Sequence, residues 1–201
     1  VNLRADAADI DARVELLTRS EIKTASFAGV PTKKGMQRPK EAGVLTMPKV
    51  GARRHALKML DWGADVIIAQ GGEGGGHTGS VATTCLLPAV VDAVEGRVPV
   101  LGAGGFSDGR GLVAALAYGA QGVAMGTRFL LTKESPVPEI TTERYLKAEF
   151  KDVIVTSEID GMPQRVVVNE LVRRLENRSG VARLVFALRN ALEFRKISGA
   201  S

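Results

Sequence analysis

The chain has 201 residues, 45% of them apolar, and a formal net charge of +5, so it is long enough for one large domain with a core or for two small ones. No apolar run approaches the roughly 18 residues of a membrane-spanning helix, and a 4% aromatic content without a recognised binding motif argues against nucleic acid as a partner. The single cysteine, Cys85, excludes an internal disulfide framework and favours a reducing compartment, from which we expect a cytoplasmic protein.

Short β-branched runs alternate with stretches whose apolar residues recur at helical spacing. In chain order, the expected strands are Val1–Leu3, Ile22–Phe27, Val44–Met47, Val66–Ala69, Val98–Ala103 and Gly122–Met125. The helices expected between them are Asp9–Arg19, Gln37–Ala42, Ala52–Trp62, Thr83–Val94 and Gly109–Tyr118. Three of the helix-to-strand junctions hold a glycine, Gly43, Gly63 or Gly119, where a left-handed C-cap residue is favoured. The alternation predicts a series of βα units.

Several expected strands, such as "DVIIA" and "VPVLGA", are apolar throughout, which indicates a parallel sheet covered by helices. An open doubly wound sheet and a barrel both fit this pattern, but a convincing Rossmann glycine fingerprint is absent. Glycine-rich segments follow successive strands at their carboxyl ends, as active-site loops do in barrels. We therefore predict an α/β fold, a (β/α)8 TIM barrel lacking its first strands. Six of the eight strands are counted here, and we expect the other two in a segment upstream of Val1.

The pattern changes after Pro138. Three further elements are expected there: a helix over residues 138–150, two extended pieces over residues 152–171 that meet at a turn of Asp160 and Gly161, and one or two basic amphipathic helices over Leu171–Ile197. We therefore predict two domains, with the barrel units in residues 1–135 and a C-terminal extension in residues 136–201.

Two consecutive corners between a strand and a helix are rich in glycine. The first turns through Gly104 and Gly105 before a helix that opens near Asp108, and the second turns through Gly126 and Thr127. Glycines at such corners let backbone N–H groups approach an anion, and helix N-termini add partial positive charge. The loops after the seventh and eighth strands are the usual phosphate site of a barrel. We therefore predict phosphate binding here, although tight corners can need glycine whatever they bind.

The segment Ala69–Gly79, "AQGGEGGGHTG", follows another expected strand and holds six glycines. Gln70 ends that strand, where its amide can both donate to and accept from a planar heterocycle. His77 is the acid–base candidate of the loop, because histidine exchanges protons near neutral pH. Glu73 and His77 could instead ligate a metal, but about three or four well-placed ligands are needed, so we predict no metal site. Cys85 lies in an apolar helix without an adjacent base, which argues against a nucleophilic role.

Basic residues concentrate between Pro31 and Lys58, where eight lysines and arginines accompany one acid, Glu41. A solvated surface of helices and loops is the simpler interpretation. The alternative is contact with an anionic partner such as a nucleotide-containing substrate. The sequence leaves both interpretations open.

The chain resembles the nitronate monooxygenase (2-nitropropane dioxygenase) family of FMN-dependent TIM barrels in "AQGGEGGGHTG", "LGAGGFSDGRGLVAALAYGAQGVAMGTRF" and "LLTKES". That family is itself similar to the flavin-dependent enoyl reductases of bacterial fatty-acid synthesis. The resemblance runs from about Ile22 to Glu134. Over the whole chain, including "VNLRADAAD" and "DGMPQRVVVNEL", it looks most like an actinobacterial branch that acts on coenzyme A thioesters in steroid ring degradation.

The resemblance implies where FMN would bind. Gln70 and Gly75 would contact the flavin, the Gly104–Gly105 turn would bind its phosphate through Gly105, and His77 would be the catalytic residue. The part of the site after the eighth strand would consist of Ala124, Met125, Gly126 and Thr127. The chain departs from the family at Gly74, where "EAGGH" becomes "EGGGH", and at Ala124, which replaces the glutamine of "QMGT". Both departures should spare FMN binding, and they leave the substrate open.

The resemblance also implies an enzyme, an FMN-dependent oxidoreductase that oxidises nitronates or nitroalkanes with oxygen. The alternative is a reductase or dehydrogenase that uses flavin and NAD(P)H on a cyclic acyl-CoA in steroid ring degradation, or an enoyl reductase. A non-catalytic module that binds FMN or another phosphate ligand is a second alternative, because the first loops of the barrel are not in this chain. The expected partner is a small-molecule substrate. The sequence leaves open whether the protein forms a homo-oligomer, and neither nucleic acid nor a membrane is expected as a partner.

Overall fold

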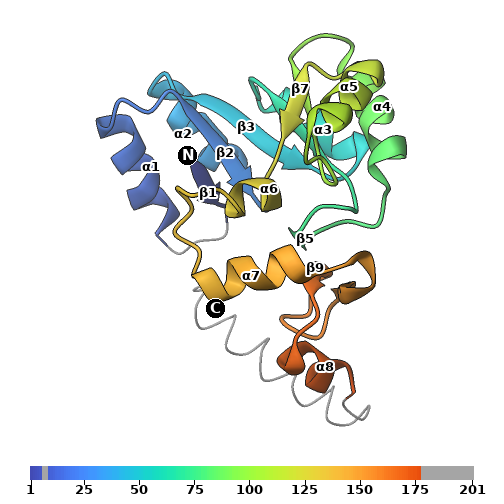
Figure 1. The fold of residues 1–201 in the computed structure, drawn as a ribbon. Helices are drawn as coiled ribbons and strands as arrows, with labels where there is room; N and C mark the ends of the chain where they lie inside the picture. The colour runs from blue at the N-terminus through green and yellow to red at the C-terminus, as the bar shows by residue number, and fades with distance from the viewer. Residues whose placement is uncertain (6–8, 178–201) are drawn as a thin grey trace. The chain divides into compact units, whose positions relative to one another are not determined.

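The computed structural model describes residues 1–5 and 9–177, which fold into two compact units (Figure 1). Unit 1 comprises Val1–Gly72 and Ser80–Ala124, and unit 2 comprises Glu73–Gly79 and the chain from Met125 onward. The loop around His77 therefore belongs with the C-terminal part of the chain. The division into domains at residue 135 stays a prediction.

Unit 1 is built around a six-stranded parallel sheet with the order β1-β2-β3-β4-β6-β7. The strands are β1 (Asn2–Arg4), β2 (Thr24–Ala28), β3 (Leu45–Val50), β4 (Ile67–Gln70), β6 (Val100–Ala103) and β7 (Gly122–Ala124). The helices between them are α1 (Ile10–Arg19), α2 (Lys33–Glu41), α3 (Arg53–Asp61), α4 (Thr83–Val94) and α5 (Gly109–Ala117). Each strand pairs with the next strand of this sheet in the chain, so the predicted α/β class and the predicted series of βα units are confirmed.

Most element boundaries differ from the prediction by one to four residues; strand β3, for example, ends at Val50 rather than at Met47. Two of the differences have identifiable reasons. Helix α2 begins at Lys33 rather than at Gln37, because the Thr32 side chain accepts a hydrogen bond from Gly35 N and caps a first turn that lacks apolar residues. Strand β6 begins at Val100 rather than at Val98. Pro99 has no N–H to donate, although its carbonyl accepts a hydrogen bond from Ile67 N.

The core of unit 1 lies between the helices and the sheet. Side chains alternate along β2, where Ala25 and Phe27 are buried against the helices and the residues between them are half-buried. Strand β3 alternates in the same way. Only β4 has three consecutive buried residues, so coverage of both faces is observed for this strand and not for β2 or β3. The helices contribute Met36, Met59 and Leu87, which are almost completely buried. The face of the sheet away from this core is its inner face, on which the half-buried residues of β2 and β3 lie.

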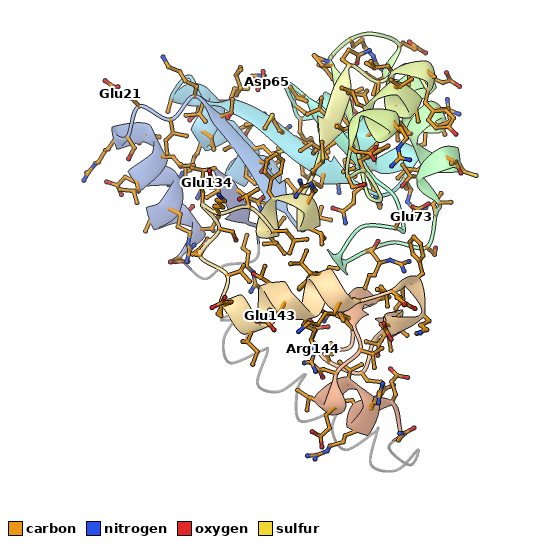
Figure 2. All side chains as sticks on the ribbon, viewed as in Figure 1. Glu21, Asp65, Glu73, Glu134, Glu143 and Arg144 are labelled. Atoms are coloured by element: carbon orange, nitrogen blue, oxygen red, sulfur yellow. The ribbon has the colours of Figure 1, made fainter. Side chains whose placement is uncertain are left out.

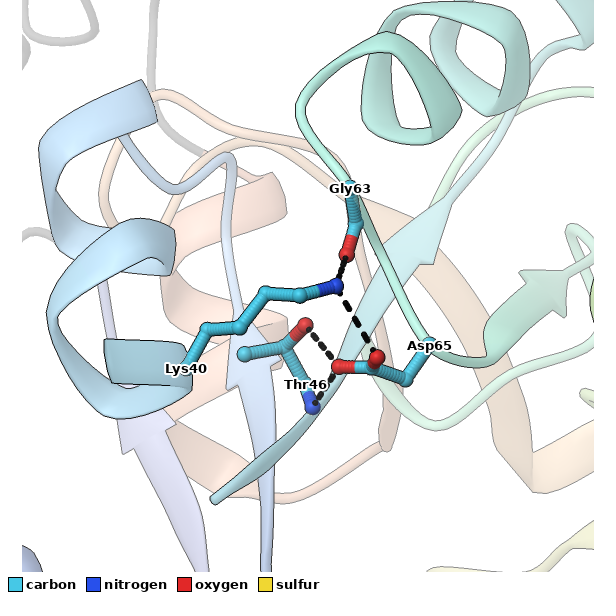
Figure 3. A network of polar contacts seen from close by, with 4 residues as sticks. All are labelled: Lys40, Thr46, Gly63 and Asp65. Carbon is cyan, nitrogen blue, oxygen red and sulfur yellow. Dashed lines mark hydrogen bonds and ion pairs between the residues drawn. The ribbon is translucent and has the colours of Figure 1, made fainter. Parts of the chain in front are cut away.

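A polar network joins α2, β3 and the start of β4 in unit 1 (Figure 3). The Asp65 carboxylate accepts hydrogen bonds from the backbone N–H and the hydroxyl of Thr46, both at 2.9 Å. The Lys40 ammonium donates to the same carboxylate at 3.0 Å and to the Gly63 carbonyl. Burial raises the pKa of Asp65, but the donors from Thr46 and Lys40 outweigh it and hold the pKa below its ordinary value of 3.8.

We expect Asp65→Asn to lower the free energy of unfolding by about 1.5–3 kcal/mol at pH 7, because hydrogen bonds to a charged acceptor are lost. The folded-state pKa of Asp65 is depressed, so its contribution is fully present above the unfolded value of about 3.9 and is lost as the pH falls through the folded value. Urea denaturation at pH 7, 5 and 3 should show the difference between wild type and variant shrinking only at the lowest pH. Asp92→Asn, at an exposed site on α4, is the matched control. A difference that grew on acidification would contradict the assignment.

Unit 2 contains a three-stranded antiparallel sheet with the order β5-β9-β8. Its elements are β5 (Gly76–His77), α6 (Thr127–Leu130), α7 (Glu139–Lys147), the 3-10 turn η1 (Phe150–Asp152), β8 (Val153–Thr156), β9 (Gln164–Val167) and α8 (Glu170–Glu176). The predicted helix after Pro138 and the predicted extended pair are confirmed as α7 and as β8 with β9. Of the helices predicted over Leu171–Ile197, α8 covers the start, and the residues beyond 177 lie outside the described residues.

The helices of unit 2 carry ordinary surface and capping interactions. Glu143 and Arg144 mark the exposed side of α7 (Figure 2), where Glu143 pairs with Lys147 at 3.0 Å. The Asn169 side chain caps α8 by accepting a hydrogen bond from Val172 N at 2.8 Å. Within residues 1–5 and 9–177, no helix combines the length and the apolar character needed to cross a bilayer.

Candidate active site

The carboxyl ends of three neighbouring strands meet at one edge of unit 1. Gln70 at the end of β4 is in register with Ala103 of β6, which is in register with Ala124 of β7. A hydrogen bond of 2.9 Å from Gly71 N to the Ala103 carbonyl extends the pairing beyond β4. The predicted site residues Gln70 and Ala124 therefore end strands at the edge where the Gly104 turn begins.

The turn after β6 offers backbone donors to an anion. Gly104 and Gly105 both adopt positive φ angles, +98° and +80°, which favour glycine. Neither amide donates a hydrogen bond to another residue in the described part of the chain. Consecutive amides in such a turn form an anion-binding concavity. The Thr83 hydroxyl donates to the Gly104 carbonyl at 3.2 Å and steadies the turn.

The N-terminus of α5 is already capped by its own chain. The Asp108 carboxylate accepts hydrogen bonds from Arg110 N at 3.0 Å and Gly111 N at 3.4 Å and pairs with the Arg110 guanidinium. The hydrogen bond from the Arg110 side chain is the main cause that lowers the pKa of Asp108. An anion at this corner would therefore meet the amides of Gly104 and Gly105 rather than the first turn of the helix.

Lys49 on β3 is a functional candidate that the sequence pattern did not single out. Lys49 is in register with Ile68 of β4 and lies on the inner face of the sheet. Gln70, two residues after Ile68 in β4, lies on the same face. The side chain is half-buried, and burial lowers the pKa of its ammonium. Among the described residues it has no acidic partner within 4 Å. The sequence did hold a signal that could have identified this residue, because Lys49 is the only charged residue within the strand "LTMPKV".

The glycine loop of unit 2 is less irregular than its composition suggests. It begins at Glu73 (Figure 2), and its second half forms β5, which pairs antiparallel with β9 through Gly76 with Arg165 and His77 with Gln164. Thr78 N donates to the Pro163 carbonyl at 3.0 Å and continues the pairing. The sequence analysis did not predict this strand.

The same loop lies against the segment that follows β7. A Cβ atom built on Gly75 would stand 2.7 Å from Thr127 Oγ1, closer than real contacts allow. The predicted site residues Gly75 and Thr127 are therefore neighbours, with Met125 and Gly126 directly before Thr127 in the chain. A side chain at position 75 would have to displace the threonine hydroxyl.

His77 contacts a carboxylate from the C-terminal part of the chain. Its Nε2 lies 2.7 Å from Asp160 Oδ2, with 52% of the histidine side chain and 29% of the aspartate side chain exposed. Burial raises the pKa of Asp160, but the Met162 amide and the His77 ring outweigh it and hold the pKa below the ordinary value. An ionised carboxylate can only accept hydrogen bonds, so the Nε2–H of His77 is the donor.

The remaining sequence candidates have simpler surroundings. Cys85 lies within α4, as predicted, with an exposed side chain. Three members of the basic stretch are engaged locally: Arg38 pairs with Asp11, Lys40 with Asp65, and the Lys58 ammonium lies 4.7 Å from the centre of the Trp62 ring. Arg53 and Arg54 are exposed at the start of α3, just beyond the carboxyl end of β3.

The predicted site residues thus fall into two groups, each assembled within one unit. Gln70, Gly104, Gly105 and Ala124 gather at the carboxyl edge of the sheet in unit 1. Gly75, His77, Met125, Gly126 and Thr127 belong to unit 2. Sequence reasoning missed Lys49 in the first group and Asp160, as a partner of His77, in the second.

Comparison with known families and proteins gives one consistent result. The family model described as nitronate monooxygenase matches residues 2–196. The chain is 57% identical over 199 residues, 98% of its length, to the (3aS,4S,5R,7aS)-5-hydroxy-7a-methyl-1-oxo-octahydro-1H-indene-4-carboxyl-CoA dehydrogenase of Mycobacterium tuberculosis. It spans 56% of the length of that relative.

Two solved structures share the fold at appreciable sequence identity. FabK from Thermotoga maritima superposes with a TM-score of 0.82 at 36% identity, covering 95% of this chain and 63% of FabK. The nitroalkane oxidase of Streptomyces ansochromogenes superposes with a TM-score of 0.73 at 32% identity, covering 81% and 50%. These matches confirm the predicted fold class, and the six parallel strands of unit 1 are six of the eight strands of a TIM barrel.

Proposed function

Because the chain belongs to the nitronate monooxygenase family, we propose that it is part of an FMN-dependent oxidoreductase that dehydrogenates a coenzyme A thioester with a hydroxylated bicyclic ring. The observation that carries this proposal is the 57% identity over 98% of the chain to a dehydrogenase named for such a thioester. This similarity reverses the order of the two activities expected from the sequence, which placed nitronate oxidation first.

The residues at the site fit FMN. The amides of Gly104 and Gly105 would provide donors for its phosphate, and Gln70 would provide an amide for the edge of its ring system. Lys49, on the same inner face as Gln70, provides a positive charge for an anionic group of the cofactor or substrate. Because Gly75 has no side chain, only its backbone lies beside Thr127. When bound, FMN would supply a two-electron acceptor for a hydride.

In this proposal His77 performs the proton chemistry. Dehydrogenation removes a proton and a hydride from the substrate. The imidazole of His77 would receive the proton, and FMN, when bound, would supply the acceptor for the hydride. The exposed ring is accessible to a small molecule, and its Nε2 contacts the Asp160 carboxylate. The ring can also donate a hydrogen bond to a thioester carbonyl once it has taken up the proton.

Arg53 and Arg54 favour a coenzyme A thioester over a small nitronate. Both are exposed at the start of α3, which follows the carboxyl end of β3 and so lies at the edge of the sheet that holds Gln70 and Gly104. Two guanidinium groups at this edge suit the diphosphate of coenzyme A, since arginine binds phosphate through paired N–H donors. A nitronate has no such groups to recognise.

Nitronate oxidation with oxygen is the second candidate. It is favoured by the description of the matching family model and by the 32% identity to a nitroalkane oxidase. The site residues proposed for FMN and for proton transfer would be the same. The two candidates differ in the substrate and in the acceptor that regenerates the oxidised flavin, which is NAD(P)+ or oxygen.

Anaerobic titration of the full-length, FMN-loaded protein tests the proposal. We expect the indene-carboxyl-CoA thioester to bleach the flavin absorbance, and neither free coenzyme A nor the free acid to do so. Exchanging Arg53 and Arg54 for alanine should raise the KM for the thioester and leave that for ethyl nitronate unchanged. Bleaching by ethyl nitronate alone, with oxygen uptake in air, would replace the proposal by the second candidate. Stable FMN binding without reduction by either compound would indicate the non-catalytic module.

A further inference from the structure

His77 is held by a scaffold that lies entirely within unit 2. The backbone of His77 lies in strand β5, which pairs with β9. The N–H of the following residue, Thr78, donates a hydrogen bond to the Pro163 carbonyl. Asp160 stands 83 residues away in the sequence, in the turn between β8 and β9, and reaches the same ring. The backbone pairing and the side-chain contact therefore come from one hairpin.

The Asp160 carboxylate is itself fixed before it meets the histidine. Its Oδ1 accepts a hydrogen bond from Met162 N at 3.1 Å, which closes the turn around Gly161, and Gly161 adopts a φ of +84°. The other oxygen, Oδ2, lies 2.7 Å from His77 Nε2. One oxygen of the carboxylate thus serves the turn and the other the ring, so the carboxylate cannot rotate without breaking a hydrogen bond.

We propose that Asp160 is a positioning residue for His77: its carboxylate accepts the Nε2–H, sets the orientation of the ring and selects the neutral tautomer whose lone pair is on Nδ1. This inference rests on the proposed proton transfer by His77. The fixed tautomer presents a base to the substrate without a prior proton shift between the ring nitrogens. In the step itself, Nδ1 bonds to the proton of the substrate hydroxyl as the O–H bond breaks, and the electrons of that bond form the C=O bond. The C–H bond on the same carbon breaks with its electrons as a hydride, for which FMN, when bound, would supply the acceptor, and Asp160 stays ionised beside the resulting imidazolium.

The test combines kinetics with nitrogen-15 NMR of histidine-labelled, full-length, FMN-loaded protein. The His77 ring signals are assigned by their loss in His77→Gln. In the neutral form of the ring, wild type should show the proton on Nε2, and Asp160→Ala should show a mixture of tautomers. For Asp160→Ala we expect kcat to fall by about 10- to 100-fold, as for carboxylates that orient other functional histidines, with KM and FMN affinity unchanged. Asp160→Glu should recover part of the loss, and Glu143→Gln on α7 is the matched carboxylate control.

The outcomes separate this inference from the proposed function. Unchanged ring signals and unchanged kcat in Asp160→Ala would overturn the positioning role while leaving His77 as the base. Unchanged turnover in His77→Gln would overturn the proposed function of His77, even if Asp160 still selected the tautomer. If Asp160→Ala does not fold, Asp160→Asn keeps the size and one acceptor oxygen. In that variant a kcat equal to that of wild type would count against the inference, and a loss of about tenfold would support it.

Discussion

Replacing His77 with Asn in the full-length enzyme should lower kcat for the thioester by about 10²- to 10⁴-fold, the usual contribution of a general base. The amide of asparagine can form hydrogen bonds, but it cannot accept a proton at neutral pH. FMN binding should be unchanged, since the phosphate and ring contacts proposed here come from other residues. With 52% of its side chain exposed, His77 contributes little to the core, and we expect stability to change by less than about 0.5 kcal/mol.

Steady-state kinetics and the flavin absorbance of the purified variant check both parts of this expectation. His55→Asn, at the other histidine of this chain, on α3 of unit 1, is the matched control and should retain full activity. Turnover by His77→Asn at the wild-type rate would show that another group accepts the proton. Loss of FMN together with activity would show that the residue supports cofactor binding instead.

Gly71→Ala should destabilise unit 1 by roughly 3 kcal/mol or more, the upper range for adding a group to a fully packed site. A Cβ at Gly71 would lie 2.0 Å from Thr83 Oγ1, 2.5 Å from Thr83 Cα and 2.6 Å from Thr83 N. A hydroxyl can rotate away, but backbone atoms at the start of α4 can move only with the helix. The strand end that carries Gln70 would therefore be pushed away from α4.

Chemical denaturation of the FMN-free and FMN-loaded proteins measures this effect. Gly109→Ala is the matched control, because a Cβ there meets no atom within 4 Å. Adding Thr83→Ala to Gly71→Ala should restore little stability, since the Cα and N atoms of residue 83 remain in place. Equal stability of the Gly71 and Gly109 variants would show that β4 and α4 can separate at low cost.

The fold of unit 1 was largely predictable because its signals are local. Helix α4 was predicted with both ends correct, since a long apolar helix has a strong period and is bounded by polar or small residues. The glycines after α2, α3 and α5 all have the expected positive φ. The beginning of α2 was missed because Lys33 and Lys34 give no apolar period, and the cap at Thr32 is the only local signal.

The candidate site was predictable where its residues follow strands directly and unpredictable where it depends on distant pairing. Gln70, Gly104 and Gly105 could be placed from the strand pattern alone. Strand β5 has only two residues and a partner near the other end of the described chain, so neither periodicity nor turn chemistry indicates it. The turn at Asp160 was predicted, but the contact of its side chain with His77 arises only from the pairing of β5 with β9.

The pairing of β5 with β9 also sets the order in which the protein can mature. During synthesis His77 leaves the ribosome 83 residues before Asp160, a delay of roughly 4–17 s at 5–20 residues per second. During that interval the helices of unit 1 can pack against its strands, while the loop around His77 still lacks the hairpin that pairs with it. A nascent chain interrupted before β9 would therefore lack the hairpin that pairs with β5 and contacts the His77 ring.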